Sequence, residues 1–291
     1  MEIKDARIDG GNPFDWGRTA ADYARYRDIY PPEFYRSILD RGVGLAGQQV
    51  LDIGTGTGVL PRHLYKHGAH WLGVDPSPQQ IAEARRLSTG MNIDYRVCAA
   101  EAVEAPDGSF DAITVCQCYW YLDPPRAARQ FARFLPTGGK VLLLVMNWLP
   151  FEDSIANASE QLVLRYNPSW SGAGEQEQPI VPNPAYNTDF TCTCQRTWRL
   201  QVPFTRESWH GRMRACRGVG ASLTPGDLQS WEQEHRALLE RMYLAGQPWS
   251  VSVPAQAAGA AALRETAYRE RVRSLVRRER PCLAKRLGTL G

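Results

Sequence analysis

Three glycines and two aspartates form the clearest chemical pattern in this sequence. In the stretch LDIGTGTG, Gly54, Gly56 and Gly58 follow Asp52 at every second position, and Asp75 ends the next apolar run. Glycine lets a backbone turn tightly and lets a ligand lie directly on the peptide groups at a helix N-terminus. A carboxylate after the following strand can accept hydrogen bonds from ribose hydroxyls. The pattern favours a nucleoside-cofactor site, with a purely structural glycine turn as the alternative.

A second pattern lies in VCQCYWYLD, residues 115–123. Cys116 and Cys118 would share one face of a strand, and Cys192 and Cys194 form another pair with the same spacing. Zinc ligands are usually separated by about two to four residues, so we predict no metal site here. The remaining interpretations are a piece of buried core and the floor of a binding site.

The elements that would hold these residues alternate between strands and helices from residue 49 to residue 148. Apolar runs predict strands at 49–54, 70–75, 91–98, 110–117 and 140–148, and helical spacing predicts helices at 58–67, 78–87 and 124–135. This alternation predicts a parallel sheet with helices on its faces. Open parallel sheets bind ligands at the carboxyl ends of their strands, where both patterns fall.

The composition is typical of a folded, water-soluble protein, with 43% hydrophobic and 22% charged residues. No apolar run reaches the roughly 20 residues that a membrane-spanning helix needs, and residues 1–10 lack the apolar core of a signal peptide. Seven cysteines, an odd number scattered along a long chain, indicate reduced thiols. We therefore expect a cytoplasmic protein without a membrane partner.

The spacing at the glycine turn distinguishes two classes of cofactor. The dinucleotide fingerprint requires glycine where this chain has Val59, whereas DxGxGxG is complete. Together with GVDPS, CAAEAVEAPDGSFDAI and LPTGGK, the stretch VLDIGTGTG resembles the class I S-adenosylmethionine-dependent methyltransferases of the small-molecule, type 11 group, over about residues 14–148. The resemblance implies an α/β, doubly wound, mostly parallel seven-stranded sheet of the Rossmann-like methyltransferase fold. It also implies N-terminal helices and S-adenosyl-L-methionine as cofactor. The irregular residues that follow the fifth strand, rich in Trp, Asn, Pro and Gly, predict a cap insertion there.

The resemblance assigns cofactor-binding roles by position. Gly54 and Gly56 would lie under the methionine part of the cofactor, with Asp52 near its amino end, and Asp75 would hold the ribose. The other cofactor-binding residues that it implies are Tyr23, Gly58, Pro76, Ser77, Ala100, Glu101, Gln117 and Cys118. Ala99 departs from the family pattern, which commonly has aspartate there. The alternative to a cofactor-binding role for Tyr23 is a structural one, in which its ring packs the N-terminal helix against the sheet.

The acceptor side is predicted from the aromatic segment and from residues 147–222. The resemblance directs Tyr119 and Trp120 toward the acceptor, and Trp148 and Arg217 are further predicted contacts. A sulfonium methyl is already activated, so its transfer is an in-line displacement that needs mainly alignment and exclusion of water. His210 is the best candidate base among five histidines, with a structural histidine as the alternative.

The acceptor itself is predicted to be a small organic molecule methylated on O, C or N. Arg212, Arg214 and Arg217 could hold a carboxylated acceptor, or they could form a solvated basic helix face. Two other classes are a binding protein that keeps the fold without activity and a nicotinamide-dependent oxidoreductase. A nucleic-acid base methyltransferase is disfavoured, because Asp123-Pro124-Pro125 more simply opens a helix.

Five segments are predicted along the chain. They are an N-terminal helical lid (1–48), the cofactor-binding core (49–148), a cap with a return strand at 197–204 (149–222), a helix and a last strand at 249–253 that complete the core (223–255), and a basic tail (256–291). Residues 264–286 hold nine Lys or Arg and three Glu, which fits a basic amphipathic helix or a solvated tail. We expect no nucleic-acid partner and a monomer or homodimer.

Overall fold

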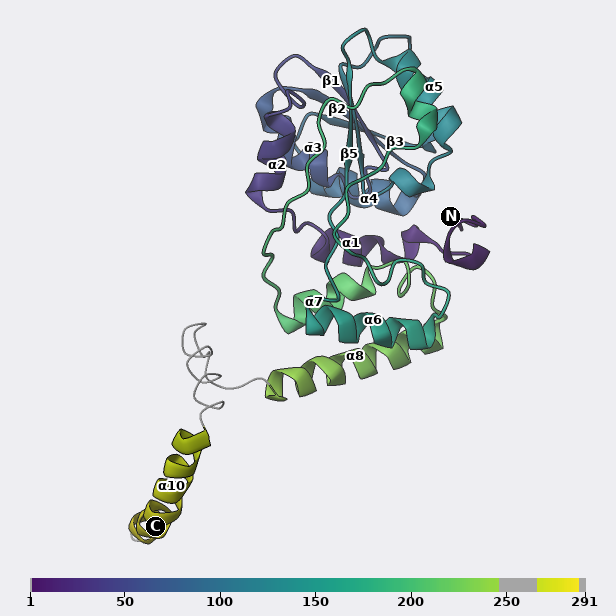
Figure 1. The fold of residues 1–291 in the computed structure, drawn as a ribbon. Coiled ribbons are helices and arrows are strands. Elements are labelled where there is room, and N and C mark those ends of the chain that lie inside the picture. The colour runs from purple at the N-terminus through teal and green to yellow at the C-terminus, as the bar shows by residue number, and fades with distance from the viewer. Residues whose placement is uncertain (1, 246–265, 288–291) are drawn as a thin grey trace. The chain divides into compact units, whose positions relative to one another are not determined.

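A computed structural model of the protein describes residues 2–245 and 266–287, and its centre is a sheet of parallel strands (Figure 1). The strands are β1 (Gln49–Ile53), β2 (His70–Asp75), β3 (Ile93–Val97), β4 (Ala112–Cys116) and β5 (Lys140–Leu144). Their order across the sheet is β3-β2-β1-β4-β5, and every neighbouring pair is parallel. The predicted α/β class and the five strands expected between residues 49 and 148 are confirmed.

The strand order fixes where this sheet can bind a ligand. β1 lies between β2 and β4, with Asp52 opposite Gly73 on one side and opposite Thr114 on the other. The chain moves outward through β2 and β3 on one side of β1, and through β4 and β5 on the other. The order therefore reverses between β1 and β4, and open sheets bind ligands beyond the carboxyl ends of the strands at such a reversal.

Helices cover the sheet and extend beyond one of its ends (Figure 1). They are α1 (Ala20–Tyr26), α2 (Pro32–Leu39), α3 (Val59–Leu64), α4 (Pro78–Leu87), α5 (Pro124–Phe134), α6 (Ser154–Tyr166), α7 (Arg206–Arg214) and α8 (Pro225–Ala245). Side chains cap several of them: Ser77 caps α4, Asp123 caps α5, and Thr224 accepts the N–H of Asp227 in α8. Asp123-Pro124-Pro125 therefore opens a helix, as the sequence indicated.

Separate apolar clusters cover the two faces of the sheet. On one face, α2 and α3 pack in a cluster that includes Val50 and Trp71. On the other face, Phe131 of α5 packs in a cluster with Ile113 and Val115. Because both faces are covered, the strands need apolar residues at successive positions, which explains their continuous hydrophobic runs.

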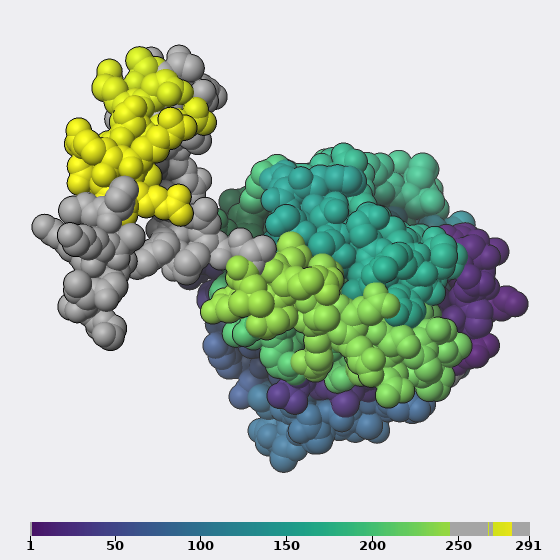
Figure 2. Space-filling view, turned by 90° about the horizontal axis from the view of Figure 1, so that it is seen from below, coloured from purple at the N-terminus to yellow at the C-terminus, as the bar shows by residue number. Residues whose placement is uncertain are grey.

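A helical layer of α6, α7 and α8 has an apolar core of its own. Its buried members include Leu162, Trp209, Met213, Trp231 and Leu239. α1 lies between this layer and the sheet and packs against α7 and α4 (Figure 1). Figure 2 shows from below the continuous surface that α6 and α8 form beside the N-terminal segment. The sequence assigned α8 to the sheet core, whereas its side chains pack within the helical layer.

The predicted return strand at 197–204 is wrong, because residues 191–205 form no helix or strand. Its alternating apolar residues serve two different cores: Trp198 packs against the α2–α3 cluster, and Phe204 packs against Trp209 of the helical layer. Arg199, between them, is bound by Glu152 and Glu177. Among the described residues the sheet has five strands rather than seven, and the last predicted strand, 249–253, lies outside those residues.

The basic C-terminal segment contains the helix α10 (Thr266–Leu287), which belongs to a separate unit of the chain. Its exposed apolar residues include Val272, Leu275 and Val276, and arginines at positions 271, 273, 277 and 278 lie among or beside them. Within residues 2–245 and 266–287, no helix is both long and apolar enough to cross a membrane.

Candidate functional site

The glycine turn follows β1 and leads into α3. Gly54, Gly56 and Gly58 have φ angles of 62°, 54° and 75°, a conformation that favours glycine. Two of the three also lie directly against a side chain: Gly54 faces Cys118, and Gly58 faces the phenol ring of Tyr95. Gly56 has more space, because the nearest side-chain atom to a Cβ there would be in the ring of Tyr23, at 3.6 Å. The turn is therefore anchored at both ends and open at Gly56.

Asp75, at the end of β2, holds the middle of this turn. One carboxylate oxygen, Oδ2, accepts the N–H of Gly56 at 3.0 Å, and Oδ1 accepts the N–H of Ser77 at 2.9 Å. Burial raises the pKa of Asp75 to about 6. Each carboxylate oxygen has two acceptor sites, so the group can take further hydrogen bonds from a ligand while it holds the turn. The predicted ribose position thus lies beside Gly56.

Asp52 and Cys118 lie under and beside the turn. Asp52 is almost fully buried and accepts the hydroxyl of Thr114 at 2.6 Å, and burial raises its pKa to about 6. Cys118 donates its thiol to the carbonyl of Ile53 at 3.1 Å, whereas Cys116 donates to the hydroxyl of Tyr30 at 3.6 Å. The two thiols of VCQCYWYLD therefore contact different partners. Among the described residues, no group of three His, Cys, Asp or Glu is placed to hold a metal ion.

The residues predicted for the adenine edge follow β2 and β3 in the chain. Ala100 is buried, and Glu101 accepts the N–H of Asp123 at 3.1 Å. Pro76 and Ser77 follow Asp75 directly, and Ser77 is buried as the cap of α4. These four residues follow the carboxyl ends of β2 and β3, which lie on one side of β1 in the sheet.

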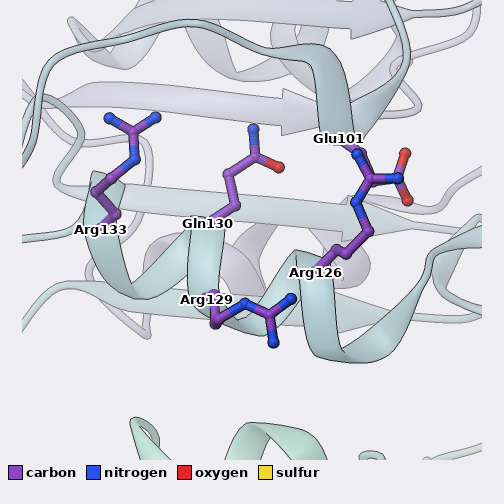
Figure 3. Close-up of a pocket in the computed structure, with 5 residues that line it drawn as sticks. All are labelled: Glu101, Arg126, Arg129, Gln130 and Arg133. Atoms are coloured by element: carbon purple, nitrogen blue, oxygen red, sulfur yellow. The ribbon is translucent and has the colours of Figure 1, made fainter.

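A surface pocket of about 270 Å³ lies along α5 (Figure 3). Its lining residues are Glu101, Arg126, Arg129, Gln130 and Arg133. Arg133 is already bound by Asp107 and by the carbonyl of Ala105. Apart from Glu101, none of the predicted site residues lines this pocket, so it is distinct from the glycine turn.

The aromatic segment follows β4 and begins with a strained residue. Gln117 has a φ angle of 61°, which is uncommon for a residue with a side chain, and its amide donates to the carbonyl of Met146 at 2.6 Å. Tyr119 accepts the N–H of Asn183 at 2.6 Å, so its hydroxyl is engaged by a distant loop. Trp120 is 39% exposed and is the most accessible aromatic residue of the segment. Strained backbone of this kind is common at functional sites.

The N-terminal segment joins the turn to the aromatic residues. The ring of Tyr23 lies against Gly56, and the Arg27 guanidinium lies 4.6 Å from the centre of that ring. Trp16 meets the rings of both Tyr23 and Tyr121 edge-on. Sequence reasoning overlooked Trp16, although FDWG places it just before the helix that carries Tyr23.

Two of the predicted acceptor residues are held by other parts of the protein. Arg217 is bonded to Asp9 at 2.7 and 3.0 Å, to the hydroxyl of Tyr121 at 2.7 Å and to Ser171 at 2.9 Å. Its donors therefore fix the N-terminal segment. Trp148 donates its indole N–H to Glu160 at 2.6 Å, while its ring face remains in contact with Arg212.

His210, the candidate base, lies inside the helical layer. It is almost fully buried, its ring stacks on Trp231, and its Nδ1 lies 2.9 Å from Nδ1 of His235. Burial lowers the pKa of His210 to about 4 and that of His235 to about 3. Among the described residues, these contacts are with α8 rather than with the glycine turn. The structure thus does not bring His210 together with the predicted cofactor residues.

The buried histidine pair should make stability depend on pH. Unfolded imidazoles have a pKa near 6.5, so between about pH 6.5 and 4 the unfolded state binds protons that the folded state does not. The free energy of unfolding should therefore fall as the pH drops through this range, by at most about 1.4 kcal/mol per pH unit for each histidine. Urea unfolding at a series of pH values measures this slope.

Two variants isolate the contribution of the histidine pair. His235→Asn should flatten the slope, whereas His67→Asn, at an exposed position, should leave it unchanged. The comparison with wild type is needed because Asp52 and Asp75, with raised pKa values, contribute a slope of opposite sign between about pH 4 and 6. An equal slope in the wild type and His235→Asn would contradict the buried neutral pair.

The parallel sheet, the glycine turn and Asp75 define an α/β protein with a candidate nucleoside-cofactor site, and comparison with known proteins identifies its family. A methyltransferase-domain family matches residues 51–143. The ubiquinone biosynthesis O-methyltransferase of Pseudomonas aeruginosa (strain UCBPP-PA14) is 31% identical over 157 residues, which are 53% of this chain and 67% of that protein. The enzyme of the same name from Xanthomonas oryzae pv. oryzae is 34% identical over 128 residues, covering 43% of this chain and 54% of that protein.

The chain belongs to the class I S-adenosylmethionine-dependent methyltransferases. It spans between about half and two thirds of the length of the relatives that it matches. A solved structure that it resembles in part is the YcgJ protein from Bacillus subtilis, with 26% identity and a TM-score of 0.38, covering 47% of this chain and 60% of that one. The resemblance inferred from VLDIGTGTG and GVDPS is confirmed.

Proposed function

We propose that the protein transfers a methyl group from S-adenosylmethionine to a small organic acceptor beyond the carboxyl ends of β1 and β4. The observation that carries this proposal is the pairing of the Asp75 carboxylate with the N–H of Gly56, which holds the glycine turn open beside a hydrogen-bond acceptor. The names of the relatives favour an oxygen acceptor. Transfer to a nitrogen or carbon acceptor would use the same in-line geometry, and the same assay would detect it.

The residues present fit the proposed cofactor. Asp75 would accept the ribose hydroxyls, and Gly54 and Gly56 would support the methionine part, with Asp52 near its amino end. The adenine edge would be formed by Pro76, Ser77, Ala100 and Glu101, while Tyr23, Gln117 and Cys118 would border the methionine part. A Cβ at Gly56 would meet no atom closer than 3.6 Å, with the ring of Tyr23 and Oε1 of Gln80 as its neighbours, and this space supports the assignment. When bound, the cofactor supplies an activated methyl group.

The protein's own contribution would be alignment and exclusion of water. Tyr23 and Trp16 form an aromatic edge over the turn, and Trp120 provides an exposed ring where the acceptor would lie. Fixing two reactants in line removes much of the entropic barrier of a displacement. His210 remains a candidate base only if the helical layer opens, because its ring is buried between α7 and α8.

The proposed function can be tested before the acceptor is known. The protein would be incubated with S-adenosylmethionine that carries a trideuterated methyl group and with a small-molecule extract of bacterial cells. Mass spectrometry should then find a metabolite that gains one trideuteromethyl group. If no metabolite gains the label while added NADH binds and changes its fluorescence, the oxidoreductase alternative would replace this proposal.

Replacing Trp120 with alanine should impair turnover of the acceptor more than binding of the cofactor. Loss of a stacked aromatic contact is worth about 0.5–1.5 kcal/mol, so kcat/KM for the labelled acceptor should fall about 2- to 12-fold. The dissociation constant of S-adenosylhomocysteine, measured by calorimetry, should change less than about 2-fold. Phe151→Ala, at a more exposed aromatic residue, is the matched control and should leave both values unchanged. A larger loss in cofactor binding than in turnover would contradict the assignment of Trp120.

A further inference from the structure

Two guanidinium groups meet on the inner side of the helical layer. Arg27 follows α1, Arg212 lies in α7, and both direct Nη1 toward the thiol of Cys216, at 3.9 and 3.2 Å. Arg212 is 5% exposed, and its Nε has no hydrogen-bond partner. In the part of the chain that the structure describes, no ion pair involves either arginine. A buried positive charge and a half-buried one therefore lie together without a carboxylate partner.

Neighbouring arginines of the same segment are treated differently. Arg214 is paired with both Asp22 and Glu232, and Arg217 is paired with Asp9. The fold thus supplies acidic partners to the adjacent basic residues and leaves Arg27 and Arg212 without one.

Burial makes the absence of an anion costly. A buried charge normally requires a partner of opposite charge, and two like charges repel each other in a medium of low dielectric constant. The ring of Tyr23 lies against Arg27 and that of Trp148 against Arg212, at 4.6 and 4.7 Å, and such contacts offset part of the cost. Burial and the charge of Arg27 lower the pKa of Arg212 to about 10, so it still carries its charge near pH 7.

The pair also lies beside the proposed methyl-transfer site. Tyr23 connects Arg27 to Gly56 of the glycine turn, and Trp148, which contacts Arg212, follows β5. Tyr30 accepts the thiol of Cys116 at the carboxyl end of β4. The arginines are therefore bordered by aromatic rings from the segments that surround the carboxyl ends of the strands.

We propose that Arg27 and Arg212 bind a carboxylate group of the methyl acceptor. This inference rests on the proposed function, and it identifies the acceptor as an organic acid whose body packs on aromatic rings. Guanidinium groups form paired, charge-assisted hydrogen bonds with carboxylates, and the unpartnered Nε of Arg212 supplies one such donor. The cofactor's methionine also carries a carboxylate, so the test must distinguish the two sources.

Calorimetry on the full-length protein can separate these sources with defined probes. Acetate, benzoate and 4-hydroxybenzoate would be titrated with and without saturating S-adenosylhomocysteine, each beside its uncharged amide. Wild type should bind at least one acid about 10-fold more tightly than the amide. Arg212→Met should remove this preference and change the dissociation constant of S-adenosylhomocysteine by less than about 3-fold.

Two further variants accompany Arg212→Met. Arg27→Gln, at a half-buried position, should repeat the effect if Arg212→Met unfolds the protein, and Arg214→Gln should keep the preference for the acid. A loss of S-adenosylhomocysteine binding as large as the loss of acid binding would assign the pair to the cofactor and overturn the proposal. Equal binding of every acid and its amide by wild type would also overturn it. Absence of S-adenosylhomocysteine binding by wild type would instead count against the proposed function.

Discussion

Asp75→Asn is expected to weaken the binding of S-adenosylhomocysteine by about 100-fold, or about 2.7 kcal/mol. Hydrogen bonds to a charged group are worth about 1.5–3 kcal/mol, and the neutral amide would accept the ribose hydroxyls less strongly. The substitution also affects the turn itself. Both oxygens of Asp75 accept backbone N–H groups, from Gly56 and Ser77, so the NH2 of asparagine would face one of these donors.

The same carboxylate should make cofactor binding depend on pH. Burial raises the pKa of Asp75 to about 6. Wild type should therefore lose affinity for S-adenosylhomocysteine as the pH falls below about 6, because the Asp75 carboxylate becomes protonated. Asp75→Asn should show a weaker dependence, and the part that remains is assigned to Asp52, whose pKa burial also raises to about 6. Asp94→Asn, at an exposed aspartate on the neighbouring strand β3, is the control and should match wild type. Unchanged affinity in Asp75→Asn would remove Asp75 from the cofactor site.

Gly58→Ala should destabilise the fold by about 2–5 kcal/mol. A side chain in the left-handed conformation costs about 1–2 kcal/mol, and extra volume in a packed core costs about 1–3 kcal/mol. Gly58 has a φ angle of 75°, and a Cβ there would lie 2.9 Å from Cζ of Tyr95 and closer still to its hydroxyl. Because that hydroxyl is bonded to Ser88 at 2.9 Å, the phenol ring is not free to move away.

Urea unfolding of matched glycine variants separates the two costs. Gly108 has a φ angle of 63°, and nothing lies within 4 Å of the position that a Cβ would take there, so Gly108→Ala should lose only about 1–2 kcal/mol. Adding Tyr95→Phe to Gly58→Ala removes the nearest atom and should restore part of the lost stability. If Gly58→Ala and Gly108→Ala lose equal amounts, Tyr95 does not pack against the turn as described.

The parts of the fold that sequence could predict depend on local pattern. The five strands from β1 to β5 and the helix starts at Ser77 and Asp123 are each specified by a few neighbouring residues, through apolar runs or capping side chains. The glycine turn is equally local, since Asp52 to Gly58 are contiguous. For this reason the glycine turn after β1 and Asp75 at the end of β2 could be located from the sequence, whereas their contact with a cofactor stays a prediction.

The failures have a common physical cause, which is that the partners lie far apart in the chain. Alternation at 197–204 resembled a strand, but nothing local shows that Trp198 and Phe204 belong to different cores. Arg217 is held by Asp9, 208 residues away, and no local pattern indicates that pairing. The meeting of Arg27 with Arg212 is similarly invisible without the structure.

Calorimetric titration of the wild-type protein with S-adenosylhomocysteine tests the central claim most directly, with NADH titrated in parallel. The glycine turn, held by Asp75 and open at Gly56, predicts saturable binding of one S-adenosylhomocysteine per chain and no comparable binding of NADH. Binding of NADH without binding of S-adenosylhomocysteine, or binding of neither ligand, would contradict the assignment of this turn as the methyl-donor site.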